Sequence, residues 1–103
     1  MLVVLAEARF DPAQTERVRA VARPMIEASR AEPGCAGYDY AFDLIEPDLM
    51  RVRELWRDEQ ALRDHFATPH MATFVAALRA LQPRGLSVKC YELGPERPMP
   101  SGG

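Results

Sequence analysis

The sequence has little of what marks several large classes of protein. Among 103 residues there are only two cysteines, Cys35 and Cys90, and two histidines, His65 and His70. Two cysteines do not build the disulfide framework of a small secreted domain. No apolar run approaches the roughly 18 residues that a membrane span needs, and the apolar start of the chain becomes charged after Ala6 without a basic leader or cleavage site. The sequence therefore predicts a cytoplasmic protein with reduced thiols that does not engage membranes.

An excess of positive charge is also lacking. The 13 basic residues are balanced by 15 acidic ones, for a formal net charge of -2. This balance offers no electrostatic reason to bind nucleic acid. RNA-recognition domains stack bases on exposed aromatics of their first and third strands, and here the first strand has only Phe10, at its end. Glycine-rich phosphate loops and nucleophile motifs are missing too, and Cys35 is interpreted as a small buried residue.

What is present predicts one domain over residues 1–93 and a flexible tail over residues 94–103. With 48% hydrophobic residues, the chain can build a core. We expect strands over residues 2–10, 37–43, 49–57 and 86–93, and helices over residues 12–31, 59–66 and 69–82. Asp11, Asp58 and Thr68 are the expected helix N-caps.

This βαββαβ order is typical of an α+β, ferredoxin-like fold with an antiparallel sheet in the strand order 4-1-3-2. Cys35 and Cys90 would then lie near opposite edges of the sheet, which argues against a disulfide within the chain. Tyr38, Tyr40 and Phe42 share one face of the second strand. We expect them to lie on the face that the helices leave uncovered, where a second copy would cover them, and so predict a homodimer packed sheet to sheet.

Three stretches carry a family resemblance: EPGCAGYDY at residues 32–40, ELW at residues 54–56, and DEQALRDHFATPHMATFVAAL at residues 58–78. Over residues 2–93 the chain resembles the antibiotic biosynthesis monooxygenase family, small dimeric α/β barrels that include quinol monooxygenases. The resemblance implies oxygenation of an electron-rich aromatic, a quinol or a polyketide-like phenol, by O2 without metal, flavin or haem. Fold alone does not settle function.

A haem-degrading branch of the same superfamily uses an asparagine on the first strand, a tryptophan on the short helix and a histidine on the next helix. This chain has no asparagine at all. The tryptophan position falls at His65, and the haem-ligating position falls near Val75. A haem-degrading role is therefore disfavoured.

The two histidines are the candidate catalytic residues. His65 lies on the inner side of the short helix, and because imidazole titrates near neutral pH it suits the deprotonation of a phenol. His70 lies in the first turn of the next helix, whose dipole favours the neutral ring. Both residues are equally compatible with structural roles. They are five residues apart with a proline between them, and two ligands are too few for zinc, so no metal is predicted.

The predicted substrate-binding residues are aromatic or acidic and surround His65 in the expected fold: Trp56, Tyr38, Glu54, Phe66 and Phe74. Trp56 is either a core aromatic or a wall on which an aromatic substrate stacks. Glu54 lies on the same strand face. If buried, it needs a partner, which we expect to be an arginine, His65 or a group across the dimer.

Two functions remain open at this point. The first is a cofactor-independent monooxygenase with an aromatic substrate and O2. The second is a non-enzymatic dimer that binds a small hydrophobic molecule in the same cavity. Loss of oxygen consumption on substitution of His65, with binding retained, would distinguish them.

Overall fold

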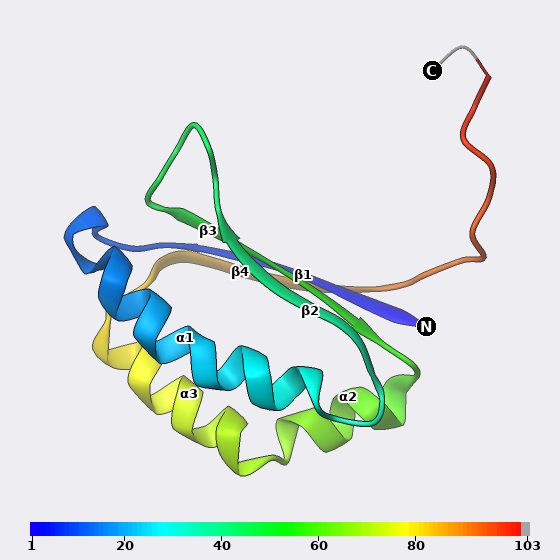
Figure 1. Ribbon diagram of the computed structural model, residues 1–103, viewed down its shortest axis with the longest axis horizontal. Helices are drawn as coiled ribbons and strands as arrows, with labels where there is room; N and C mark the ends of the chain where they lie inside the picture. Colours follow the sequence, from blue (N-terminus) through cyan, green and yellow to red (C-terminus); the bar gives the residue numbers. More distant parts are fainter. Residues whose placement is uncertain (102–103) are drawn as a thin grey trace.

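One antiparallel sheet forms a layer with all the helices on one of its faces (Figure 1). A computed structural model describes residues 1–101. The elements are β1 (Leu2–Arg9), the 3-10 turn η1 (Pro12–Gln14), α1 (Thr15–Arg30), β2 (Cys35–Phe42), β3 (Leu49–Trp56), α2 (Glu59–Phe66), α3 (Pro69–Ala80) and β4 (Arg84–Glu92). The strand order is β2-β3-β1-β4 with antiparallel pairing throughout. This confirms the predicted α+β, ferredoxin-like fold. Within the described residues, no helix is long and apolar enough to cross a membrane.

Side-chain caps begin the helices where the sequence predicts them. The Asp58 carboxylate accepts a hydrogen bond from the Ala61 amide at 2.8 Å and begins α2. The Thr68 hydroxyl accepts one from the Met71 amide at 3.3 Å and begins α3. Asp11 also caps, but it begins the 3-10 turn, so α1 itself starts later than predicted. These caps satisfy amides that a helix leaves unpaired in its first turn.

Two strands begin two residues earlier than predicted because glycine does not end them. β2 starts at Cys35, and the pairing with β3 is irregular between Cys35 and Gly37. β4 starts at Arg84, and Gly85 has a φ of 61° beside an irregularity in the pairing with β1. Glycine adopts that left-handed conformation without strain, so β4 continues through a local distortion at Gly85. The sequence pattern had predicted that the strand begins only after this glycine.

The aromatic side of β2 faces the helices, which corrects the expected placement of Tyr38, Tyr40 and Phe42. Tyr38 is 2% exposed and belongs to the core that α1, α2 and α3 cover. Tyr40 and Phe42 pack against the core on the same side. Alternation along a strand identifies the residues that share a face, but it does not tell which face the helices cover.

The uncovered face of the sheet is a mixture of ion pairs and apolar side chains. Arg51 pairs with Glu7 at 2.8 Å, and Arg53 pairs with Asp39. The hydrogen bond from Arg53 lowers the pKa of the Asp39 carboxyl below its usual range. Between these pairs, Leu5 of β1 is 47% exposed. This face therefore remains the surface on which a second copy would pack, although its aromatic content is lower than expected.

Cys35 and Cys90 are both free thiols, on the two edge strands of the sheet. Cys35 is partly buried rather than fully buried, and burial raises the pKa of its thiol. After β4, residues 93–101 form no helix or strand and extend away from the sheet (Figure 1).

Candidate functional site

A cavity of about 330 Å³ lies between the covered face of the sheet and helices α2 and α3. Most of its wall is apolar, as is usual for a site that holds a small organic ligand. The lining residues are Val4, Ala6, Glu7, Ala8, Tyr38, Tyr40, Met50, Val52, Glu54, His65, Phe66, Met71, Phe74, Val75, Leu78, Arg79, Pro83, Leu86 and Val88. The polar groups of β2, β3 and α2, namely Tyr38, Tyr40, Glu54 and His65, form part of this wall.

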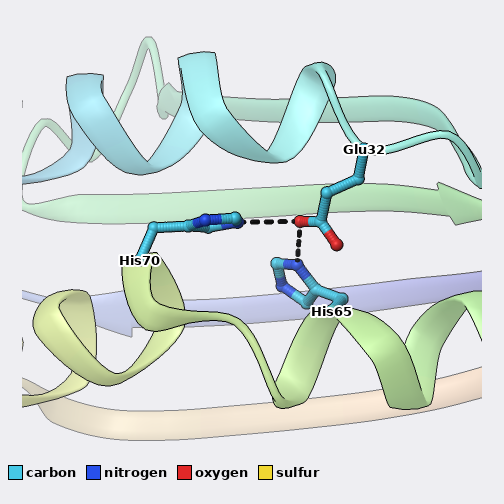
Figure 2. Close-up of side chains that lie close together, drawn as sticks. All are labelled: Glu32, His65 and His70. Atoms are coloured by element: carbon cyan, nitrogen blue, oxygen red, sulfur yellow. Dashed lines mark hydrogen bonds and ion pairs between the residues drawn. The ribbon is translucent and has the colours of Figure 1, made fainter.

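Two histidines converge on one carboxylate at the edge of this cavity. The Nδ1 atom of His65 lies 2.7 Å from Oε2 of Glu32, and the Nε2 atom of His70 lies 2.8 Å from the same oxygen (Figure 2). His65 is 1% exposed, whereas the side chains of Glu32 and His70 are 12% and 24% exposed. The three residues come from the turn after α1, from α2 and from the first turn of α3.

Local structure explains how the two histidines reach the same point. The chain leaves α2 after Phe66 and re-enters a helix at Pro69, with Thr68 between them. The Thr68 hydroxyl donates to the His65 carbonyl at 2.7 Å and also caps α3. In one continuous helix, residues five apart do not face each other. The break between α2 and α3 changes the direction of the chain, so His65 and His70 can point to the same carboxylate.

Glu32 is brought to α2 by close backbone packing. Its carbonyl accepts from the Cys35 amide at 3.0 Å, which closes the turn. Next in this turn, Gly34 approaches α2 so closely that a Cβ atom there would lie 2.3 Å from the Cβ of Ala61. The Gly34 carbonyl accepts from the Arg57 amide at 2.8 Å. The turn is therefore held against the start of α2, one helical turn from His65.

The contact with Glu32 determines which ring nitrogen of His65 is available. An ionised carboxylate only accepts hydrogen bonds, so Nδ1 of His65 carries the proton and donates it. The neutral ring then has its lone pair on Nε2, and within residues 1–101 no hydrogen bond engages that atom. Because His65 lines the cavity, this arrangement leaves Nε2 able to accept a hydrogen bond or a proton from a molecule bound there.

Glu54 and Trp56 form a second polar contact of the site. The Trp56 indole N–H donates to Oε1 of Glu54 at 2.9 Å. Glu54 is 9% exposed, and burial raises the pKa of its carboxyl. Within the described residues, the hydrogen-bond partner of Glu54 is therefore neither an arginine nor His65, and a group across the dimer stays a prediction. The indole satisfies the carboxylate because residues two apart on a strand point to the same side.

Two tyrosine hydroxyls share a hydrogen bond in the same wall. The Tyr38 and Tyr40 oxygens are 2.9 Å apart. Burial raises the pKa of both phenols, so both stay neutral at physiological pH and remain able to donate. Tyr40 was not among the predicted site residues, although its alternation with Tyr38 along β2 would have indicated it.

Comparison with known proteins gives this architecture a family. The model of the antibiotic biosynthesis monooxygenase family matches residues 1–77. The chain belongs to this family.

It is 33% identical to YcnE of Bacillus subtilis, named a putative monooxygenase, over 90% of this chain and 98% of YcnE. It is also 33% identical to the uncharacterized protein sll1783 of Synechocystis, over 89% of this chain but only 63% of the length of sll1783. A crystal structure of a putative antibiotic biosynthesis monooxygenase from Deinococcus radiodurans shares the fold, with a TM-score of 0.90, 24% identity and coverage of 98% of this chain and 100% of that one. Family and relatives support a monooxygenase-like role.

In this member of the antibiotic biosynthesis monooxygenase family, the structure gathers most of the predicted site residues at one cavity. His65, Tyr38, Glu54, Phe66 and Phe74 all line it. Trp56 is 0% exposed and lies behind the wall, with its ring centre 4.5 Å from that of His65. His70 does not line the cavity. Its Nε2 atom contacts Oε2 of Glu32.

Glu32 is the site residue that sequence reasoning missed. It lies 33 residues before His65, and only the folded chain brings them together. The sole sequence signal was its place at the start of the EPG turn. With Glu32, the cluster has three nitrogen or oxygen donors within 4.8 Å of one another, so two histidines no longer stand alone as potential metal ligands.

Proposed function

We propose that this antibiotic biosynthesis monooxygenase family member is a cofactor-independent monooxygenase that oxidises an electron-rich aromatic, a quinol or a polyketide-like phenol, with O2. One observation carries the proposal: His65, oriented by Glu32 at 2.7 Å, lines an otherwise largely apolar cavity. In the alternative, a binding protein without activity, Nε2 of His65 would only accept a hydrogen bond from the ligand.

The proposed reaction needs a base that deprotonates the substrate hydroxyl, and it does not need a cofactor. Triplet O2 reacts slowly with a neutral closed-shell phenol, whereas a phenolate readily transfers an electron to it. Nε2 of His65 takes the hydroxyl proton, and Glu32 stabilises the imidazolium that forms. For a hydroquinone the stoichiometry balances without any further reductant: the quinol and O2 give one hydroxyquinone and one water. The ring loses the electrons that reduce the second oxygen atom.

The other cavity residues would hold and orient the substrate. Phe66 and Phe74 offer aromatic surface. Because the hydrogen bond between Tyr38 and Tyr40 uses one of their two hydroxyl protons, the pair offers one neutral donor for the oxygen of the substrate. Glu54 lies in the same wall and accepts a hydrogen bond from Trp56. Trp56 fixes Glu54, and His70 fixes Glu32, so both act as positioning residues.

We also propose that the working form is a homodimer. The cavity is bounded on one side by β4, where Leu86 and Val88 are 61% and 62% exposed although they line the cavity. On the uncovered face, Leu5 and Tyr91 are 47% and 49% exposed. A second copy packed against the uncovered face would remove Leu5 and Tyr91 from water, whereas Leu86 and Val88 lie on the cavity side of β4.

The test of the proposed activity is oxygen uptake by chelator-treated protein with a panel of hydroquinones and polycyclic phenols, after autoxidation is subtracted. We expect uptake by the unmodified protein and a loss of about 10²-fold to 10⁴-fold in His65→Ala, the range attributed to a general base. Glu32→Gln should lose activity while it keeps the shape of the site. Glu27→Gln, an exposed glutamate near the end of α1, is the matched control and should be unaffected.

Uptake that persists in His65→Ala would contradict the assignment of the base. No uptake above autoxidation with any substrate would contradict the monooxygenase. If the same phenols then still bind with equal affinity to the unmodified protein and to His65→Ala, the chain is a binding protein.

A further inference from the structure

The Glu32–His65–His70 cluster has properties that the deprotonation of a phenol does not require. A base needs one orienting partner, yet Glu32 receives two imidazoles on the same oxygen, at 2.7 and 2.8 Å (Figure 2). Each residue offers one nitrogen or oxygen atom that could bind a metal ion, and these three atoms lie within 4.8 Å of one another. They come from three separate segments, and Glu32 lies 33 residues before His65.

No arginine or lysine pairs with the cluster within residues 1–101. Glu32 is 12% exposed, and its only ion-pair partners in residues 1–101 are the two histidines. A neutral imidazole donates a hydrogen bond but does not cancel a negative charge. A carboxylate largely removed from water with no arginine or lysine beside it is a costly arrangement, which a cation would relieve.

The donors are also held in place in advance. Thr68 ties the end of α2 to the start of α3 through the His65 carbonyl and the Met71 amide. The Glu32 turn is closed by hydrogen bonds to Ser29 and Cys35, at 3.1 and 3.0 Å. A site built on such fixed elements loses little conformational entropy when it binds an ion.

We propose that Glu32, His65 and His70 form a binding site for a divalent transition-metal ion such as Zn²⁺ or Co²⁺. Two imidazoles and one carboxylate suit these ions, whereas Ca²⁺ and Mg²⁺ prefer oxygen ligands. Around a tetrahedral zinc ion with bonds near 2.1 Å, ligand atoms are about 3.4 Å apart, so the present contacts must open by roughly 0.7 Å. His70, at 24% exposed, has room to make that movement. Water would complete the coordination.

The site has a consequence that rests on the proposed monooxygenase function. A metal ion on Nδ1 of His65 replaces the proton there, and the neutral ring then carries its proton on Nε2. That nitrogen becomes a donor and no longer accepts a proton from a phenol. Metal and base function are therefore mutually exclusive at His65, and the ion is an inhibitor of the enzyme.

The test is equilibrium dialysis of chelator-treated full-length protein against Zn²⁺, with the visible absorption of bound Co²⁺ as a second readout. We expect one ion per chain. Glu32→Gln and His70→Gln should each weaken binding by about 100-fold or more, the upper range for loss of a supporting group. Circular dichroism verifies that each variant is folded. Cys35→Ser is the matched control, because a thiol three residues from Glu32 is the obvious rival ligand, and it should bind as the unmodified protein does.

Absence of binding, or binding that survives in both Glu32→Gln and His70→Gln, would overturn the metal site. Oxygen uptake that falls with Zn²⁺ and returns with chelator would support the exclusion at His65, and uptake unchanged at saturating Zn²⁺ would overturn it. Because the dialysis needs no substrate, a protein that binds zinc but never consumes oxygen would refute the proposed function and leave the metal site standing.

Discussion

Glu54 is a buried acid whose cost to the fold depends on pH. Burial raises the pKa of its carboxyl, so the folded state holds the proton more tightly than the unfolded chain does. For a raised carboxyl pKa, the stability of the fold falls as pH rises from the unfolded pKa through the folded one. The ionised form therefore destabilises the protein at neutral pH.

We predict that Glu54→Gln is more stable than the unmodified protein at pH 7, because the amide oxygen still accepts from Trp56 without a charge. The difference should shrink toward zero near about pH 4, where the carboxyl is largely protonated in both states. Urea unfolding of both proteins across this pH range measures it. Glu96→Gln, in the exposed tail, should show no such pH-dependent gain. A stability gain of Glu54→Gln over the unmodified protein that is no larger at pH 7 than at pH 4 would contradict the prediction.

At the residue scale, the sequence was sufficient for side chains whose role follows from their own element. His65 on the inner side of its helix and Glu54 on the strand face of Trp56 were predicted from periodicity alone. Glu32 was not, because its partner is 33 residues away and the contact depends on how the turn after α1 packs against α2. Contacts of this kind are a property of the tertiary structure and leave no local pattern.

At the scale of elements, one glycine sets the distance between the α1–β2 turn and α2. Gly34 packs where a Cβ would lie 2.3 Å from the Ala61 Cβ, which is far inside van der Waals contact. We predict that Gly34→Ala lowers the free energy of unfolding by about 1–3 kcal/mol, as overpacking does.

Chemical denaturation measures this loss. Gly94→Ala is the matched control, since no atom lies within 4 Å of a Cβ at that position, and it should leave the stability near that of the unmodified protein. Equal stability of Gly34→Ala would show that the turn shifts away from α2 freely. It would also remove the reason for regarding Glu32 as firmly placed.

The elements themselves were largely predictable because their signals are local. Aspartate and threonine caps, prolines in first turns and alternating strands correctly predicted four strands and the break between α2 and α3. The wrong placement of the aromatic side of β2 has a clear physical origin. Alternation defines two faces of β2 without choosing between them, so Tyr38 and Tyr40 were assigned to the wrong face, whereas helix packing decided it.

At the scale of the whole molecule, the proposed homodimer follows from the uncovered face of the sheet. Leu5 lies in the middle of that face, paired with Arg53 of β3 on one side and Lys89 of β4 on the other. We predict that Leu5→Asp places a charge in the interface and weakens dimerisation by at least about tenfold, or about 1.4 kcal/mol. Sedimentation equilibrium at several concentrations measures this change.

Leu44→Asp is the control, because Leu44 is 102% exposed in the loop between β2 and β3. It should dimerise like the unmodified protein. A chain that is monomeric at every concentration, or a Leu5→Asp protein with unaltered dimerisation, would contradict packing through this face.

Trp56 gives the molecule a built-in optical reporter. It is the only tryptophan, it is 0% exposed, and its ring centre is 4.5 Å from that of His65. All indole fluorescence therefore originates directly behind the wall of the cavity. Unfolding moves this one ring into water and shifts its emission to longer wavelength. A ligand that displaces His65, or an ion held by it, changes the surroundings of the same ring, so both events can be followed without a label.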